Sequence, residues 1–145
     1  GDYFAGVVFR VDSAGNYWWR SVIRLRAGFA TRLRKIVAVA QQFPELRKIK
    51  IEDNTFQADT VQVLMKNTNL PIEGIKTTGN KTKRFAEELA PLFENRKVYP
   101  KKEMTEAINE LLTLPYGSHD DIADAFLIGK SGLGVRYEPN IRWIG

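Results

Sequence analysis

Three aspartates near the end of the sequence have a spacing that suits a divalent metal ion. They lie in the segment from Gly117 to Ala125 (GSHDDIADA). If this segment is helical, with about 100° between successive residues, Asp120, Asp121 and Asp124 fall within an arc of roughly 100° beside an apolar face. Acids in a first turn also stabilise the helix dipole, which accounts for Asp120 and Asp121 but less well for Asp124. Because like charges three or four residues apart repel, a cation among them is the alternative, and oxygen ligands favour Mg²⁺ or Mn²⁺.

A second acidic group ends an expected strand in the middle of the chain. Residues 48–53 (KIKIED) read as a short strand that finishes in Glu52 and Asp53. In α/β folds, functional sites collect at the carboxyl ends of parallel strands, where these acids can face acids from another element. The alternative is a solvated strand end. Two Mg²⁺ ions bridged by two such acidic groups can activate a water and stabilise the leaving oxygen in phosphodiester cleavage.

The composition restricts the chemistry that is open to the chain. It has 145 residues, no cysteine and one histidine, His119, which excludes thiolate zinc sites, disulfides and multi-histidine metal sites. Lysine and arginine total 22 against 17 acids, for a net charge of +5. This excess favours a polyanionic partner such as nucleic acid, the alternative being a basic surface that binds nothing. No apolar run approaches the roughly 20 residues that cross a bilayer, so we expect no membrane partner.

The hydrophobic periodicity predicts the elements that must position the acids. A hairpin opens the chain, and alternating helices and strands follow it. The expected strands are residues 5–11, 17–26, 48–53, 72–77 and a short strand before the last two helices; the expected helices contain residues 33–40, 55–66, 85–93, 104–112 and 118–130. This order favours one α/β domain over residues 1–145, with a mixed sheet that is antiparallel at the hairpin and parallel where helices cross over.

The pattern also predicts which side chains face the core. In the second strand, alternation predicts one apolar face and one wet, basic face. The apolar face would carry Trp19, Ile23 and Leu25, and the basic face Arg20, Arg24 and Arg26. The helix before residue 113 has an expected apolar stripe of Met104, Ile108, Leu111 and Leu112. Ser118 is the expected N-cap of the last helix, and Pro91 is expected to kink or restart the helix that contains it.

Three groups of residues occur in an order typical of one protein family. They are IEDNTFQ at 51–57, then KTKR at 81–84 leading into LAPLFE at 89–94 and KVY at 97–99, then HDDIADA at 119–125. Together they resemble the C-terminal nuclease domain of the phage terminase large subunit, over nearly the whole chain. The resemblance implies a ribonuclease H-like fold and a Mg²⁺- or Mn²⁺-dependent endonuclease, with two metal ions, that cuts concatemeric double-stranded viral DNA during packaging. It implies as partners an N-terminal ATPase domain of the same polypeptide, the small terminase subunit and the portal protein, in the host cytoplasm.

The family's catalytic acids can be carried over to single positions. The second acid falls on Glu52, with Asp53 beside it, and the third falls on Asp121, with Asp120 and Asp124 as alternatives. The family's first acid lies on a strand upstream of the segment that matches Gly1-Asp2-Tyr3, and so falls outside this sequence; Asp2 is at best a supporting ligand. We therefore expect an N-terminally truncated nuclease domain with weak or no activity, which a longer N-terminus would restore. The alternatives are a recombination-type nuclease of the same fold and a catalytically inactive DNA-binding or motor-docking module.

Basic residues provide the expected contacts to DNA phosphates. Residues 74–82 (GIKTTGNKT) nearly match a phosphate-binding P-loop, but an additional asparagine separates the second glycine from the lysine, so we do not expect ATP binding. The expected phosphate contacts are Lys76, Lys81, Lys83, Arg84, Arg20 and Arg24, the alternative being ordinary solvated charge. Trp18, Trp19 and Trp143 are expected to pack in the core or at an edge rather than on bases. We expect His119 to orient Asp121 or to cap its loop.

Overall fold

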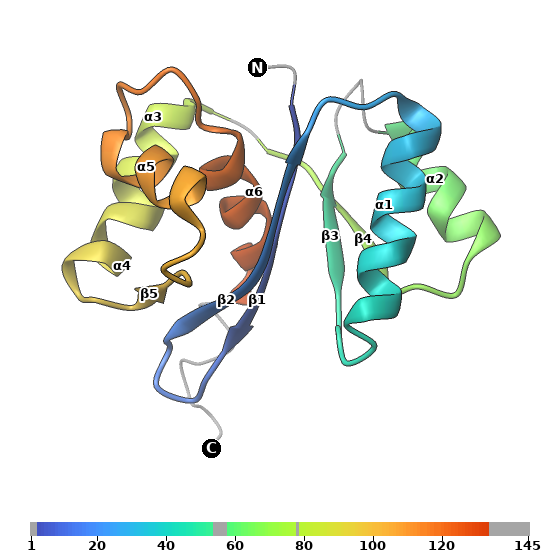
Figure 1. Ribbon diagram of the computed structural model, residues 1–145, viewed down its shortest axis with the longest axis horizontal. Coiled ribbons are helices and arrows are strands. Elements are labelled where there is room, and N and C mark those ends of the chain that lie inside the picture. Colours follow the sequence, from blue (N-terminus) through green and yellow to red (C-terminus); the bar gives the residue numbers. More distant parts are fainter. Residues whose placement is uncertain (1–2, 54–57, 78, 134–145) are drawn as a thin grey trace. The chain divides into compact units, whose positions relative to one another are not determined.

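The computed structural model describes residues 3–53, 58–77 and 79–133, which divide into two compact units. Unit 1 contains the described residues up to Arg24 together with those from Gly79 onward, and unit 2 contains those from Leu25 to Thr77. The order of elements confirms an α/β fold, with a mixed three-stranded sheet in unit 1 and a small parallel sheet in unit 2 (Figure 1).

The sheet of unit 1 is built on the expected hairpin. Its strands are β1 (Phe4–Val11), β2 (Tyr17–Leu25) and β5 (Val98–Tyr99), in the spatial order β1-β2-β5. The short strand β5 runs parallel to β2 and pairs with its beginning. The sheet is therefore antiparallel at the hairpin and parallel at β5, as the sequence predicts.

The turn between β1 and β2 is held by one aspartate. The carboxylate of Asp12 accepts hydrogen bonds from the amides of Ala14 and Asn16, both at 2.9 Å. Gly15 has a φ of 81°, a left-handed conformation that a glycine adopts without strain. These residues are the turn formers that the sequence places between the two strands.

Helices cover one face of this sheet (Figure 1). They are α3 (Lys81–Arg84), the π-helical turn η1 (Phe85–Leu89), α4 (Ala90–Glu94), α5 (Thr105–Thr113) and α6 (Asp121–Lys130). The π-helical turn ends where α4 begins, with Pro91 in the first turn of α4. Proline cannot donate to the preceding turn and its ring crowds the carbonyl four residues earlier, so the wider turn before it has a physical cause.

The core of unit 1 is an aromatic cluster centred on α6. Phe126 is completely buried, and its ring lies 5.0 to 5.3 Å from the rings of Trp19, Phe9 and Tyr17. A Cβ added to Gly129 would lie 2.7 Å from the Phe9 ring, so this glycine lets α6 approach β1 closely. Aromatic pairs at such separations add about 0.5–1.5 kcal/mol beyond the area that they bury. The cluster fixes α6, and therefore its N-terminal acids, relative to β1.

Strand β2 departs from the expected alternation. Trp19 is 1% exposed, and Val22 packs against the same core although strict alternation places residues three apart on opposite faces. Beyond this change the side chain of Arg24 is only 14% exposed and forms an ion pair with Glu106 of α5 at 3.4 Å. The prediction of a wet face is therefore wrong for Arg24, whereas Arg20 and Arg26 are exposed.

Two helix predictions in unit 1 are also wrong in detail. Helix α5 buries Ala107 and Glu110, while Leu112 is 78% exposed, so the expected apolar stripe is rotated. Helix α6 begins at Asp121, three residues after Ser118, and its N-cap residue is Asp120, whose side chain makes no capping hydrogen bond. The first turn of α6 is satisfied from α5 instead, as described below.

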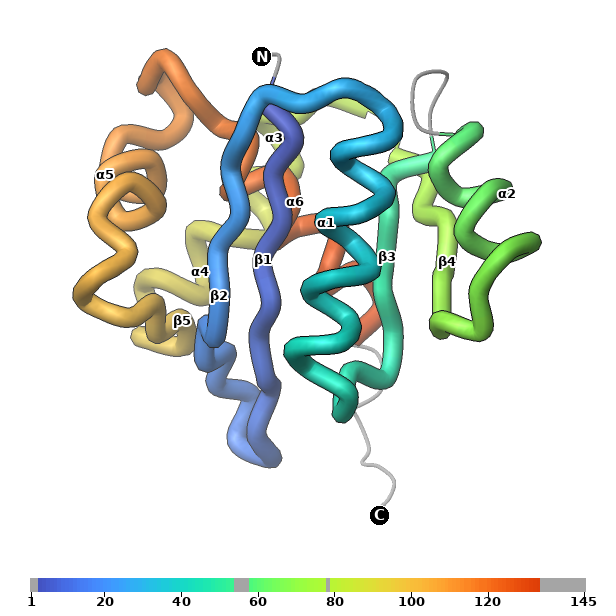
Figure 2. Tube along the Cα trace, turned by 45° about the vertical axis from the view of Figure 1, so that its right-hand side comes forward, coloured from blue at the N-terminus to red at the C-terminus, as the bar shows by residue number. Residues whose placement is uncertain are grey.

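Unit 2 has two helices and two strands. They are α1 (Phe29–Gln42), β3 (Ile49–Glu52), α2 (Ala58–Asn67) and β4 (Ile72–Ile75). Strands β3 and β4 lie side by side (Figure 2). They are parallel, with Glu52 opposite Ile75. Helix α2 packs against β4, and α1 packs against α2. The sequence therefore predicts this β-α-β unit correctly, and it places the carboxyl ends of two parallel strands side by side.

In the part of the chain that is described, no helix combines the length and apolar character needed to cross a membrane.

Candidate acidic metal sites

The N-terminal turn of α6 carries the three aspartates of the sequence motif. Asp120 is the N-cap residue, and Asp121 and Asp124 lie in the first turn. The opposite face of this turn is anchored by Ile122 and Ala123, which are completely buried. The burial of one face forces the acids to the end and side of the helix, as the spacing predicts.

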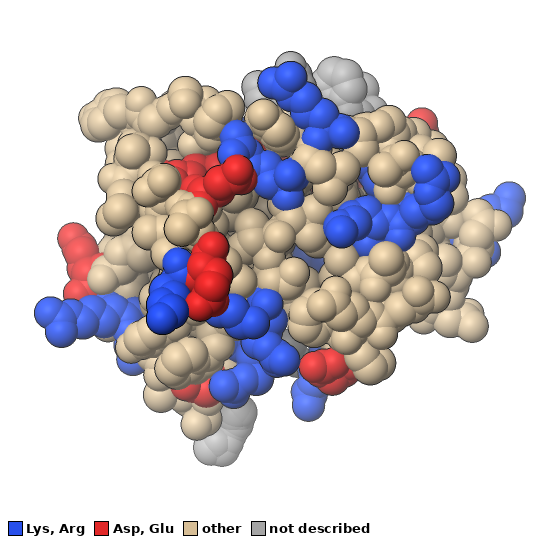
Figure 3. Space-filling model, viewed as in Figure 1, with Lys and Arg blue, Asp and Glu red and all other residues tan. Residues whose placement is uncertain are grey.

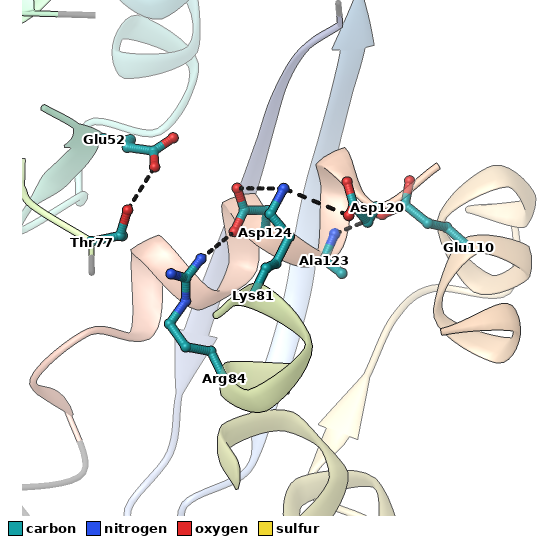
Figure 4. A network of polar contacts seen from close by, with 8 residues as sticks. All are labelled: Glu52, Thr77, Lys81, Arg84, Glu110, Asp120, Ala123 and Asp124. Atoms are coloured by element: carbon teal, nitrogen blue, oxygen red, sulfur yellow. Dashed lines mark hydrogen bonds and ion pairs between the residues drawn. The ribbon is translucent and has the colours of Figure 1, made fainter. Parts of the chain in front are cut away.

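Basic side chains from α3 already neutralise two of the three aspartates. The ammonium of Lys81 lies 3.6 Å from Asp120 and 3.8 Å from Asp124. The guanidinium of Arg84 donates a hydrogen bond of 3.3 Å to Asp124, and both side chains are less than 20% exposed (Figure 4). In this arrangement a lysine stands between two carboxylates where the sequence suggests a metal ion.

The third aspartate, Asp121, has a different neighbour. Its Oδ2 atom is buried and accepts no hydrogen bond. The nearby acid is Glu110 of α5, which is 6% exposed and has one buried oxygen, Oε1, that also lacks a partner. A buried anionic oxygen without a donor is costly, so a proton or a cation would stabilise this pair.

Glu110 anchors the start of α6. Its Oε2 atom accepts a 2.7 Å hydrogen bond from the amide of Ala123, one of the N-terminal amides that the helix itself cannot satisfy (Figure 4). Burial raises the pKa of the Glu110 carboxyl above its ordinary value of 4.5, and the negative charge of Asp121 raises it further. The amides of Ala123 and Ile122 act in the opposite direction on the same pKa. The sequence pattern did not predict a role for Glu110. The available signal was its position in a helix three residues after Ala107, on the face that the structure buries.

In unit 2, Glu52 lies at the carboxyl end of β3. Its Oε2 atom accepts a 2.8 Å hydrogen bond from the hydroxyl of Thr77, which follows β4 (Figure 4). The amide of Asp53 continues the strand pairing by donating to Ile75. A Cβ added to Gly74 would lie 3.1 Å from the Asp53 carboxylate, so the glycine leaves room for this acid. Within the described residues, neither Glu52 nor Asp53 forms an ion pair with a basic side chain.

The remaining predicted residues are distributed as follows. Lys76 is exposed. Lys83 forms an ion pair with Glu87 of the following turn at 3.9 Å. On the face drawn in Figure 3, acidic side chains lie directly beside basic ones, so this face is not uniformly positive. Lys81 and Arg84 already form ion pairs with aspartates of the protein, so their attraction for a DNA phosphate is weaker.

His119 contacts a tyrosine. Its ring meets Tyr3 edge to face, with centroids 5.6 Å apart, and Arg24 lies 4.2 Å from the centroid of the same tyrosine. The described structure contains no hydrogen bond between His119 and Asp121. Asp2, the expected supporting ligand, lies outside the described residues.

The two acidic groups differ in how well they fit a metal ion. Carboxylate oxygens suit Mg²⁺ and Mn²⁺, and the unpartnered oxygen of Asp121 is the feature of α6 that best fits such an ion. Among the residues of the described ranges, no three acids or histidines are already grouped as a complete metal site. Asp121 is therefore the candidate metal ligand of unit 1, and Glu52 is the candidate metal ligand of unit 2.

The chain matches no protein-family model, and no curated protein matches its sequence.

Proposed function

We propose that this chain is a metal-dependent DNA endonuclease domain of the type found in the large subunit of phage terminases, with a ribonuclease H-like fold. The observation that carries the proposal is the environment of Asp121, whose buried Oδ2 accepts no hydrogen bond while neighbouring Asp120 and Asp124 are paired with basic side chains. A carboxylate at the end of a parallel strand, Glu52, supplies a second acid of the kind that such chemistry requires.

In this proposal, Asp121 and Glu52 hold divalent metal, and Asp120, Asp124 and Asp53 support them. When bound, Mg²⁺ or Mn²⁺ supplies an activated water and charge stabilisation for phosphodiester hydrolysis. The residues of this chain position the acids: Glu110 fixes the first turn of α6, and Thr77 orients the Glu52 carboxylate. Double-stranded DNA is the proposed substrate, with exposed Arg20 and Lys76 as phosphate contacts. An N-terminal ATPase domain, the small terminase subunit and the portal protein are the proposed partners in a host cytoplasm.

Plasmid nicking in Mn²⁺ tests this proposal. A chain extended at its N-terminus, to supply the first acid of the family, should nick supercoiled DNA. Glu52→Gln and Asp121→Asn should each reduce the rate by on the order of 100-fold or more, since even the loss of a group that only supports a ligand costs about 10- to 100-fold. Asp59→Asn is the matched control, because Asp59 is an exposed acid in the first turn of α2. Unchanged nicking by both site variants would exclude the assigned site.

A second candidate is a catalytically inactive module that binds DNA. It is favoured by the ammonium of Lys81, which occupies the position between Asp120 and Asp124 that a metal ion would take. The same experiment separates the two functions: the inactive module would bind the plasmid without nicking it, whatever divalent ion is added.

A further inference from the structure

A shallow hollow on unit 1 lies apart from the acids of α6 and has a different chemistry. Its volume is about 460 Å³, within the range of about 300–1,000 Å³ that small-ligand sites cover. The residues that matter here are aromatic or basic: Trp18, Tyr99, Arg10, Arg20 and Lys101. We propose that this hollow binds single-stranded DNA, with an unpaired base stacked on an outer face of the Trp18–Tyr99 ring pair and flanking phosphates held by the basic side chains.

The two rings form a preorganised platform. Trp18 and Tyr99 are register partners on the parallel strands β2 and β5, and their rings stack with centroids 4.4 Å apart and an angle of 14° between the planes. The indole N–H donates a 2.9 Å hydrogen bond to Asp12, which fixes the orientation of the ring. The rings are ordered before any ligand arrives, so little conformational entropy is lost on binding.

The same rings are only partly covered by their contact with each other. Trp18 is 36% and Tyr99 is 39% exposed, whereas neighbouring Trp19 is 1% exposed and belongs to the core. The expectation that these tryptophans pack in the core or at an edge is therefore correct for both, because Trp19 lies in the core and Trp18 packs against Tyr99 of the edge strand. An exposed, flat and oriented aromatic surface is the feature on which bases stack in proteins that bind single strands.

Positive charge surrounds the platform. Arg10, Arg20 and Lys101 are exposed, and within the described residues neither Arg10 nor Lys101 forms an ion pair. Phosphates would provide partners for Arg10 and Lys101, and an unstacked base would cover the exposed ring surface. Duplex DNA exposes an unstacked base face only at its ends. The combination of rings and cations therefore favours a single strand over a duplex, and over an acidic peptide, which would use the cations alone.

Fluorescence anisotropy of a labelled oligo(dT) of about ten nucleotides tests the proposal, a length within the usual range of single-strand sites. The 145-residue chain is titrated in EDTA, so that no metal-dependent cleavage contributes. We expect Trp18→Ala and Tyr99→Ala each to weaken the affinity by roughly 5- to 150-fold, the equivalent of about 1–3 kcal/mol per stacked base. Trp18→Phe should retain most of the affinity because it keeps a ring. Tyr116→Ala is the matched control, since Tyr116 is an aromatic residue of unit 1 that is 94% exposed, and it should have no effect.

A second variant tests the electrostatic part without touching the platform. Arg10→Ala should weaken binding. It should also make the slope of log affinity against log salt concentration shallower, by the amount that one lost phosphate contact contributes. Melting temperatures of all variants establish that they are folded. The proposal is overturned if oligo(dT) does not bind, if the alanine variants bind as well as the parent chain, or if a duplex, an oligo(U) or a poly-glutamate peptide binds more tightly than oligo(dT).

This site does not depend on the nuclease. Glu52→Gln and Asp121→Asn should leave oligo(dT) binding unchanged. An N-terminally extended chain that binds oligo(dT) but never nicks plasmid would contradict the proposed function alone. An extended chain with unchanged Trp18 and Tyr99 that nicks plasmid but shows no measurable oligo(dT) binding would contradict this inference alone.

Discussion

The acids on α6 and the acids at the end of β3 have different kinds of partners. On α6, Asp120 and Asp124 are paired with Lys81 and Arg84, and Asp121 lies beside the buried Glu110. At the end of β3, Glu52 is held by one hydroxyl hydrogen bond from Thr77.

This difference separates structural acids from acids that are available to a ligand. An aspartate that is paired with arginine and largely buried already contributes to stability, and a metal ion would have to compete with the arginine for it. An acid with an unpartnered oxygen, or with one hydroxyl as partner, gains more from a bound cation. The comparison therefore favours Asp121 and Glu52 over Asp120 and Asp124 as metal ligands, and four variants test it.

The largest effect on stability is expected for Glu110→Ala. This change leaves the amide of Ala123 buried without an acceptor, which costs about 1–3 kcal/mol. Denaturant unfolding measures the loss. Glu106→Ala is the matched control on the same helix, because the Glu106 side chain is 73% exposed, and its loss should be much smaller. Equal losses in the two variants would contradict the anchoring role of Glu110.

Glu110 should also make the stability depend on pH. Its pKa is raised in the folded state, so the folded protein retains the proton above pH 4.5 while the unfolded chain loses it. The contribution of protonated Glu110 to the unfolding free energy is therefore fully present below pH 4.5, and it is lost as the pH rises through the raised pKa of the folded state. We expect the unfolding free energy of the parent chain, relative to Glu110→Gln, to fall over this range. If the difference in unfolding free energy between the parent chain and Glu110→Gln stays constant or grows with pH, burial does not disfavour the ionised form of Glu110.

Thr77→Val tests the weaker support at the end of β3. It removes the hydroxyl that donates to Glu52, and we expect a loss of about 0.5–1.5 kcal/mol in unfolding free energy. Thr113→Val provides a comparison, since the Thr113 hydroxyl bonds only to carbonyl groups of its own helix. If Glu52 binds metal, Mn²⁺ affinity should fall in Thr77→Val but not in Thr113→Val, as measured by calorimetry.

The smallest effect on stability is expected for Lys81→Met. Its ion pairs are partly exposed, so the unfolding free energy should change by less than about 1 kcal/mol. If Asp120 and Asp124 support a metal site, removal of the competing ammonium should increase Mn²⁺ affinity by up to about fivefold, the equivalent of the same energy. Lys83→Met is the control, because Lys83 pairs with Glu87 instead. Weaker Mn²⁺ binding in Lys81→Met would show that Lys81 supports the site rather than competing with it.

Local periodicity was sufficient to predict most elements. The hairpin, α1 and the β3-α2-β4 unit lie close to where alternation, helical spacing and Pro44 place them. The prediction failed where contacts between elements decide the outcome. In strand β2, the side chains of Trp19 and Val22 both contact the core, although strict alternation would place them on opposite faces of the sheet. In α5, Glu110 is buried and Leu112 is exposed.

The candidate site was predictable by residue type but not by pairing. The spacing of the three aspartates predicts a shared helix face. The structure places Asp121 and Asp124 in the first turn of α6 and Asp120 just before it, with Asp121 beside Glu110 and the other two paired with basic side chains of α3. That Lys81 and Arg84 neutralise Asp120 and Asp124 depends on how α3 packs beside α6, and no local pattern contains this information. The start of α6 was misplaced for the same reason, because Glu110 of α5 rather than Ser118 satisfies its first turn.

Paramagnetic broadening by Mn²⁺ tests most directly whether Asp121 and Glu52 each bind divalent metal. In a ¹⁵N-labelled chain, a small amount of Mn²⁺ should broaden the amide signals around Glu52 and those around Asp121. Asp121→Asn should weaken the broadening around residue 121, and Glu52→Gln should weaken that around residue 52. Broadening around only one of these residues, or around neither, would contradict the account.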